Sequence, residues 1–437
     1  MNYKSIKKVF NAPKIWHQEL STVYEIVINN FKSTAKKLLF LFCLLVFLFG
    51  CGSNSSTTKD GKEIVTLWHY FTEVDVGSFY KYIDEFNSIQ DKYLVKPQYV
   101  PREELLKQYA MGLVAGELPD IGMIDNPDQA SFSQSGLFED ITDRFNQWED
   151  NKFLEGPLNS VKYNDRIYGL PQAITCLALF YDIDAFKENN LSVPTNWSQL
   201  EEAAKLLTSG NRKGLVWSGV KNEEGTFQLL PWIISAGGNI NKINSPESVR
   251  ALTFLTDLVK NGYASKELLI WGQGDIEKQF NSGNAAMMVN GNWIIPSIKR
   301  NAPNKNWGVA KIPMDKKYAS VLGGENFTIL KGKNVEGAWA FLSWFISTEV
   351  SERYCKEIRK FSPKSDVNIE AMYGDDPIMK VFAEGVAYAV PRGPHTKWPE
   401  ISSIMINAEH EALTLNKTPK QALDDAQKLI DQINASN

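Results

Sequence analysis

Residues 64–68 read IVTLW, and residues 116–124 read GELPDIGMI. The first run is typical of a strand, and the second breaks the chain at Gly and Pro before another apolar strand. Between them, apolar residues recur twice at helical spacing, with a further strand in the middle. The strand-like segments cover 64–68, 94–100 and 121–124, and the helix-like segments cover 76–89 and 105–114. This alternation predicts an α/β fold with a parallel sheet and right-handed crossovers.

Polar and aromatic side chains follow the ends of two of these strands. Sheets of this kind bind ligands beyond the carboxyl ends of their strands. Trp68, Tyr70 and Glu73 stand at the end of the first strand, and Asp125 follows the third. We expect at least one of Trp68 and Tyr70 to face a ligand cleft, and we expect Asp125 to be a ligand group there.

The same alternation restarts beyond residue 171. Residues 173–181 are strand-like, and three later segments carry helix start signals. In the first helical segment, Thr195 is the expected amino-terminal cap and Gly210 the expected stop. In the second, Ser245 precedes a Pro at the start of the helix. Before the third, residues 418–421 (TPKQ) resemble a capping box. The sequence therefore predicts at least two α/β lobes.

The composition narrows the classes of function. The chain has 437 residues, of which 43% are apolar and 22% charged, which is typical of a globular protein of two or three domains. It contains neither a phosphate-binding loop motif nor a dinucleotide-binding G-x-G-x-x-G, and its His and Cys residues form no metal motif. We therefore expect no metal and no cofactor. His69 and His395 are interpreted as hydrogen-bonding or surface residues.

The amino-terminal region has the pattern of a secretory signal. Residues 38–50 form an apolar run of 13 behind Lys32, Lys36 and Lys37, shorter than the roughly 20 residues that span a membrane. The run ends in 48–51 (LFGC), which resembles a bacterial lipobox, so we predict cleavage after residue 50 and a diacylglycerol on Cys51. An uncut membrane anchor is the alternative. Residues 51–61 then form a lipidated, flexible tether.

Removal of this segment makes the chain acidic. The whole chain carries a net charge of −4, and residues 1–50 carry +5, so residues 51–437 carry −9. An acidic exterior disfavours nucleic acid and anionic lipid as main partners. Cys176 and Cys355 are expected to be buried free thiols, with a disulfide between them as the alternative.

Seven short motifs in a fixed order extend the interpretation. They are 118–121 (LPDI), 164–171 (NDRIYGLP), 194–197 (PTNW), 280–288 (FNSGNAAMM) with 291–293 (GNW), 307–310 (WGVA), 323–326 (GGEN) and 338–342 (AWAFL). This succession resembles family 1 of the extracellular solute-binding proteins, the maltose-binding-protein-like receptors of ABC importers. The resemblance covers nearly all of 62–437.

The resemblance implies a two-lobed periplasmic-binding-protein-like fold of type II, with hinge-linked lobes and a ligand cleft between them. It places three crossing segments near 172–175, 321–326 and 360–363. The amino-terminal lobe is then 62–172 plus 323–362, and the carboxyl-terminal lobe is 173–322 plus 363–437.

The resemblance also implies binding rather than catalysis. A carbohydrate, in particular an oligosaccharide, is captured by hinge closure and delivered to the transmembrane permease, while a separate subunit hydrolyses ATP. The expected protein is a monomer, held at the outer face of the cell membrane through Cys51.

Candidate ligand residues combine aromatic faces for sugar C–H groups with polar groups for hydroxyls. The candidates are Trp68, Tyr70, Glu73, Asp125, Gln172, Tyr181, Trp232, Asn290, Trp293, Gly324, Glu325, Arg392 and Trp398. Trp232 and Trp398 fall where the family carries stacking aromatics and are favoured as contacts. The alternative role for Glu325 is to brace the hinge.

Two alternatives stay open. A surface glycosidase needs two carboxylates across a cleft, which Glu73, Asp125 and Glu325 could supply. A receptor for glycerol phosphate or a similar phosphorylated polyol needs a cationic pocket, for which Arg392 is the one basic candidate. The numbers of aromatic and basic candidates favour a neutral sugar.

Overall fold

The computed structural model describes residues 57–71 and 73–435. The proposed signal segment and Cys51 lie outside the described residues, as do the side chains of Glu73, Val74 and Glu103.

Five strands form the sheet of the first lobe, in the order β2-β1-β3-β12-β6. β1 runs parallel to β2 and β3, whereas β12 is antiparallel to β3 and β6. The strands are β1 (Glu63–His69), β2 (Tyr93–Tyr99), β3 (Ile121–Asp125), β12 (Glu325–Ile329) and β6 (Leu170–Pro171). The three strands predicted before residue 125 are thus confirmed, and their carboxyl ends meet at one edge.

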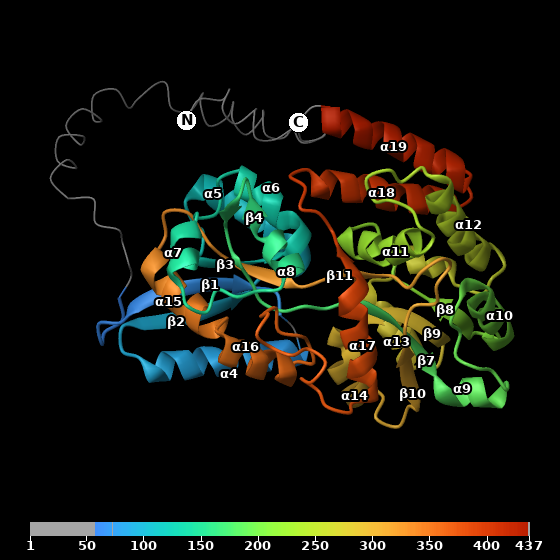
Figure 1. Cartoon of the computed structure of the whole chain (residues 1–437), viewed down its shortest axis with the longest axis horizontal. Helices are drawn as coiled ribbons and strands as arrows, with labels where there is room; N and C mark the ends of the chain where they lie inside the picture. The colour runs from blue at the N-terminus through green and yellow to red at the C-terminus, as the bar shows by residue number, and fades with distance from the viewer. Residues whose placement is uncertain (1–56, 72, 436–437) are drawn as a thin grey trace, which may run out of the picture. The chain divides into compact units, whose positions relative to one another are not determined.

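Helices cover both faces of this sheet. Figure 1 shows α4 and α16 on one side of it and α5 and α6 on the other. The helices of this lobe are α4 (Glu73–Ile89), α5 (Arg102–Ala115), α6 (Gln129–Gln134), α7 (Thr142–Gln147), α8 (Glu155–Ser160), α15 (Val335–Phe345) and α16 (Thr348–Glu357). Because both faces are covered, strand residues such as Val65, Leu67 and Met123 are fully buried.

A second, four-stranded sheet has the order β10-β7-β9-β8. Its strands are β7 (Leu177–Asp182), β8 (Lys213–Val216), β9 (Ala285–Gly291) and β10 (Trp307–Ala310). Around it lie α9 (Ile183–Glu188), α10 (Trp197–Leu207), α11 (Glu223–Ser235), α12 (Pro246–Lys260), α13 (Gln273–Asn281), α14 (Ile295–Asn301), α17 (Pro377–Tyr388), α18 (Trp398–Leu413) and α19 (Pro419–Ala435). The two-lobed α/β architecture predicted from the sequence is confirmed.

The chain passes between the two sheets on segments that pair with one another. Ile174 exchanges both backbone hydrogen bonds with Phe361, and Thr175 does the same with Gly323. Close by, β11 (Ser320–Leu322) pairs in parallel with β13 (Ala389–Pro391). Four distant segments of the chain therefore lie side by side between the sheets.

The helix start signals are largely confirmed. Ser245 caps α12 by accepting a hydrogen bond from the Ser248 amide, and Thr418 and Gln421 cap each other at α19. The cap of α10 is not Thr195 but Asn196, whose side chain accepts from the Gln199 amide. The amide side chain of the next residue, Asn196, thus occupies the cap position assigned to Thr195.

Cys176 and Cys355 are buried free thiols, as predicted, and burial raises the pKa of each to about 12.

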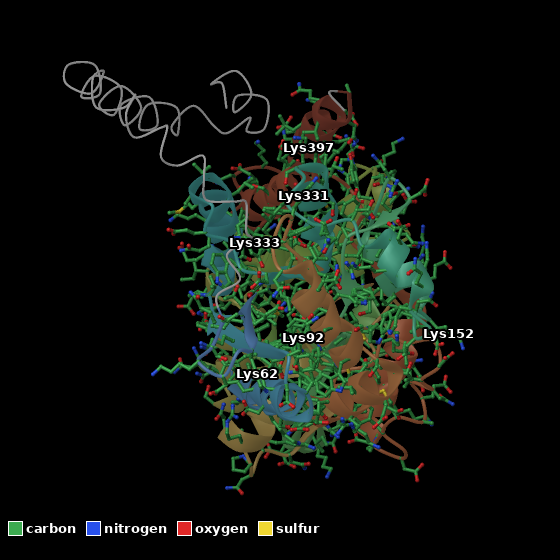
Figure 2. All side chains as sticks on the ribbon, turned by 90° about the vertical axis from the view of Figure 1, so that its left-hand side faces the viewer. Lys62, Lys92, Lys152, Lys331, Lys333 and Lys397 are labelled. Atoms are coloured by element: carbon green, nitrogen blue, oxygen red, sulfur yellow. The ribbon has the colours of Figure 1, made fainter. Side chains whose placement is uncertain are left out.

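Among the described helices, none is long and apolar enough to cross a membrane. Figure 2 shows Lys62 and Lys92 close together on the first lobe, where they precede the paired residues Glu63 and Tyr93, and Lys333 farther along the same view.

Gly324 is required by the close approach of the pairing segments, and we predict a large effect of replacing it. Its φ is +137°, and an added Cβ would lie 2.1 Å from the Ala173 carbonyl oxygen. Gly324→Ala should therefore lower the free energy of unfolding by about 2–4 kcal/mol, measured by urea titration. Gly262→Ala is the matched control, because Gly262 also has positive φ (+76°) but open space around it. Equal losses in the two variants would contradict this prediction.

Candidate functional site

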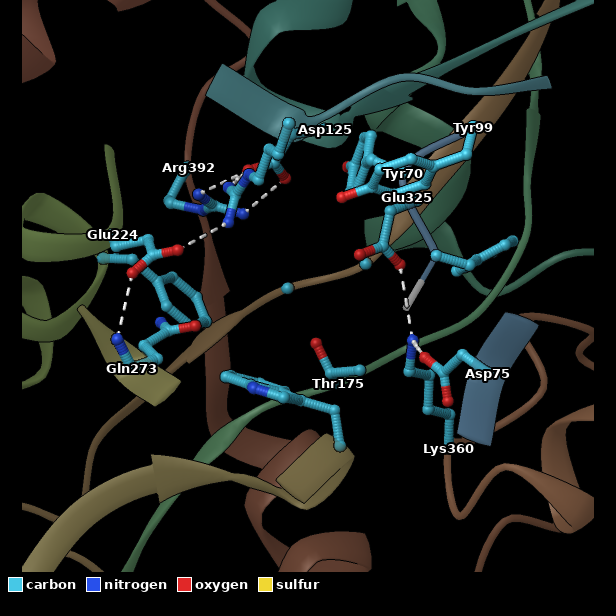
Figure 3. Close-up of a pocket in the computed structure, with 16 residues that line it drawn as sticks. Tyr70, Asp75, Tyr99, Asp125, Thr175, Glu224, Gln273, Glu325, Lys360 and Arg392 are labelled. Carbon is cyan, nitrogen blue, oxygen red and sulfur yellow. Dashed lines mark hydrogen bonds and ion pairs between the residues drawn. The ribbon is translucent and has the colours of Figure 1, made fainter. Parts of the chain in front are cut away.

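A cavity of about 290 Å³ opens where the carboxyl ends of the first sheet face the second lobe (Figure 3). Both lobes and the pairing segments contribute to its wall. It is lined by Tyr70, Phe71, Asp75, Tyr99, Arg102, Asp125, Thr175, Glu224, Phe227, Gln273, Trp293, Gly323, Gly324, Glu325, Lys360 and Arg392. The volume is typical of a site for a small ligand.

Arg392 joins the two lobes at one side of this cavity. It follows β13, and its side chain is 3% exposed. Its guanidinium lies 2.9 Å from Asp125 Oδ1 on β3 and 2.7 Å from Glu223 Oε1 on α11, and its Cζ lies 4.4 Å from the centre of the Phe227 ring. Burial alone would raise the pKa of Asp125, but Arg392 and Arg102 together hold that pKa below its usual value. Asp125 is therefore an ionised hydrogen-bond acceptor at neutral pH.

Lys360 forms the second charged group, on the opposite side of the cavity in Figure 3. Its Nζ lies 2.8 Å from Asp75 Oδ2 and 3.8 Å from Glu325 Oε2, and its side chain is 4% exposed. Burial would lower the pKa of Lys360, but the two carboxylates outweigh it and raise the pKa. The charged amine is thus held in place and can donate to a ligand oxygen.

Aromatic rings also line the cavity. The Trp293 ring lies 6.1 Å from that of Phe227, while Tyr70 and Tyr99 line the cavity from the first lobe. Trp293 covers Gly291, where an added Cβ would come within 1.7 Å of the indole. Gly291, which has no Cβ, therefore leaves the space that the Trp293 ring occupies.

Six of the predicted residues line the cavity: Tyr70, Asp125, Trp293, Gly324, Glu325 and Arg392. Whether they contact a ligand stays a prediction. Glu73 begins α4, and its side chain is outside the described residues, so its role stays a prediction as well.

The two favoured tryptophans are not on the cavity wall. Trp232 is fully buried in α11, with its ring 6.1 Å from Trp197 and 5.9 Å from Phe254. Trp398 is 3% exposed, and its indole nitrogen donates to Glu223 Oε2 at 3.1 Å. Trp232 is a core residue, and Trp398 orients the carboxylate that pairs with Arg392. The expectation of direct stacking is corrected for both.

Four further candidates lie away from the cavity. Trp68 stacks on Tyr109 at 5.8 Å, because alternation along β1 turns it toward α5. Tyr181 packs on Phe186, with ring centres 5.3 Å apart.

Asn290 is buried and donates to the Gln273 carbonyl at 3.0 Å, so it supports a cavity residue from behind. Gln172 is 1% exposed, and its backbone amide donates to the Glu325 carbonyl. Its side-chain amide is buried, and Gln172 does not line the cavity.

Several cavity residues were missed by the sequence reasoning. Asp75, Arg102, Gln273 and Lys360 belong to helices or loops without a recognisable binding motif. Lys360 had a signal, because it lies in a segment expected to cross between the lobes. His69 is buried, and burial lowers its pKa to about 4, so it is a neutral core residue. No group of three potential metal ligands occurs within the described part of the chain.

Comparison with known proteins assigns the family. Residues 81–381 match the sequence profile described as bacterial extracellular solute-binding protein. The chain belongs to this family. The solute-binding protein therefore has the fold that the motif order implied, and it is a binding protein rather than an enzyme.

Individual relatives are more distant. A multiple sugar-binding protein of Streptococcus mutans is 23% identical over 71% of this chain and 77% of its own length. Among solved structures, an ABC transporter solute-binding protein of Thermotoga lettingae bound to α-D-tagatose is 26% identical with a TM-score of 0.78, covering 85% of this chain and 99% of that one. A maltose-bound protein of T. maritima is 25% identical with a TM-score of 0.75, again covering 85% and 99%.

Proposed function

We propose that this solute-binding protein is the receptor of an ABC importer for a neutral carbohydrate, which binds in the cavity between the lobes. The observation that carries the proposal is the composition of the wall, where the rings of Tyr70 and Trp293 line the same cavity as Arg392, Lys360 and their carboxylate partners. Aromatic faces match the C–H face of a sugar, and ionised groups pair with its hydroxyls. Sugars in the solved relatives support the same class.

A phosphorylated ligand fits this wall less well. Each of the three cations in the cavity has a carboxylate partner: Arg102 and Arg392 pair with Asp125, and Lys360 pairs with Asp75. A phosphate would need to displace one of these carboxylates. Sugar hydroxyls can instead donate to the carboxylates and accept from the cations without breaking the pairs.

The paired segments at 174–175, 323–324 and 361 provide the hinge in this proposal. Extended segments can change φ and ψ at a few residues while both sheets stay intact, and a ligand that contacts both lobes favours the closed form. With this hinge, the proposed lobes have the limits expected from the sequence, which are 62–172 plus 323–362 for one lobe and 173–322 plus 363–437 for the other.

Delivery to a membrane permease and anchoring through a lipid on Cys51 complete the proposal. The family is extracellular by its description, and a diacylglycerol has two chains, which suffice for stable attachment. Mass spectrometry of the protein purified from membranes should show a diacylglycerol on Cys51.

The proposal predicts saturable sugar binding that depends on Trp293. The purified full chain in detergent is titrated with mono-, di- and oligosaccharides and with glycerol phosphate, and melting is recorded. A ligand at 100 times its dissociation constant should stabilise the fold by about 2.7 kcal/mol. Trp293→Leu should abolish that gain, whereas Trp344→Leu, which removes a half-buried tryptophan of α15, should keep it.

Two outcomes would oppose the proposal. A response to glycerol phosphate alone, weakened by salt, would replace the sugar with a phosphorylated polyol. Equal loss of the sugar-induced stabilisation in Trp293→Leu and Trp344→Leu would contradict the assignment of the cavity as the binding site.

A further inference from the structure

A second cavity, of about 320 Å³, adjoins the first. Tyr70, Arg102, Asp125 and Glu224 line both cavities, so these four residues form the partition between them. The rest of the second wall comprises Leu105, Leu106, Asp128, Lys221, Asn222, Glu223, Pro399, Ser402 and Ser403. It therefore also has contributions from both lobes, through α5, α11 and α18.

Arg102 is the most exposed charged residue of this partition. Its guanidinium lies 2.6 Å from Asp125 Oδ2 in the first lobe and 3.4 Å from Glu224 Oε1 in the second. The side chain keeps 34% exposure, in contrast to the 3% of Arg392. Ion pairs of partly exposed side chains are weak, so Arg102 can leave Glu224 at low cost. Arg392, by comparison, is fixed by burial on all sides.

The second cavity has the chemistry of a sugar site without a tryptophan. Leu105 and Leu106 offer an apolar surface, while Ser402 and Ser403 bring hydroxyls and Asp128 a carboxyl group. Asp128 is 8% exposed, and burial, with the nearby Asp125 and Glu223, raises its pKa well above the usual value. A carboxyl group that holds its proton can both donate to and accept from a sugar hydroxyl.

We propose that the second cavity holds a further sugar unit of the same ligand, and that Arg102 is the residue that selects ligand length by closing or opening the passage between the cavities. This inference rests on the carbohydrate-binding function proposed above. A ligand that fills the first cavity alone keeps the contact between Arg102 and Glu224. A longer ligand displaces Arg102 from Glu224 and gains the contacts of the second cavity.

The test compares ligand lengths in two variants of the full chain. Dissociation constants are measured by calorimetry for glucose, maltose and maltotriose, and for mannose, mannobiose and mannotriose. Ser403→Trp fills the second cavity from an exposed position of α18. It should raise the dissociation constant of the longest bound sugar about tenfold and leave that of the shortest bound sugar unchanged. Ser88→Trp, at an exposed position of α4 that lines neither cavity, is the matched control and should change neither constant.

Arg102→Ala tests the partition itself. Removal of the guanidinium joins the two cavities. The affinity for the long sugar, relative to that for the short sugar, should therefore rise about tenfold. Circular dichroism melting checks that the variant is folded.

The outcomes separate the two proposals. Equal effects of Ser403→Trp on short and long sugars, an unchanged ratio in Arg102→Ala, or a wild-type protein that binds only single sugar units would overturn the length-selecting role while the sugar receptor stands. Wild-type protein that binds no member of either series, or of the wider sugar panel above, would overturn the carbohydrate function and this inference with it.

Discussion

Arg392→Ala should lower the free energy of unfolding by about 3–5 kcal/mol, because it leaves the carboxylates of Asp125 and Glu223 without the buried cation that both contact. The same change should abolish ligand binding, since Arg392 lines the first cavity. Urea titration in the absence of sugar measures the first effect, and calorimetry with the sugar that binds best measures the second.

The control for this change is an arginine with an exposed ion pair. Arg353 contacts Glu85 at 2.9 Å, but its side chain is 45% exposed, so Arg353→Ala should cost less than about 1 kcal/mol. A double variant, Arg392→Ala with Asp125→Asn, should lose less than the sum of the single losses, because it no longer leaves Asp125 charged without its main partner. Similar losses for Arg392→Ala and Arg353→Ala would contradict the proposed role of the buried network.

Glu409→Gln should stabilise the protein at high pH and leave it unchanged at low pH. Glu409 is fully buried on α18, and among the described residues the Trp217 indole, 3.1 Å from its Oε1, is the group that counters the effect of burial on its pKa. Burial raises its pKa from 4.5 to about 8. The folded state therefore holds a proton that the unfolded state releases above pH 4.5. The stability of the wild-type protein consequently falls as the pH rises from about 4.5 to about 8.

Glutamine has the shape of the protonated acid and cannot ionise. The variant should match the wild type at pH 4.5 and exceed it by roughly 3 kcal/mol at pH 7. The measurement is a series of urea titrations across this range. Glu411→Gln, on the same helix but half-buried, is the control and should follow the wild-type profile more closely. Parallel profiles for wild type and Glu409→Gln would contradict the prediction.

The local elements were predictable because their signals are local. Apolar alternation and helical spacing produced β1, α4, β2, α5 and β3 close to their observed limits. The capping residues of α12 and α19 followed from side chains that bond to amides three residues away. The order of the short motifs, rather than any one of them, indicated the family.

The cavity was only partly predictable. Strand-end rules found Tyr70 and Asp125, and the motif at 291–293 found Trp293. Trp232 was assigned from the family resemblance rather than from a local pattern, and α11 is buried over 11 consecutive residues, from Gly225 to Ser235. A helix that is buried on all sides gives no sign of which face meets a ligand.

The sequence by itself determined the helices and strands, the two-lobed class and the family, because hydrogen bonding and side-chain periodicity within an element act over a few residues. The tertiary structure alone decided which charges meet in the cavity. Lys360 and Asp75 are 285 residues apart in the chain, and Arg392 and Asp125 are 267 apart. Such pairs come together only when the crossing segments align the two sheets, so no local pattern in the chain encodes them.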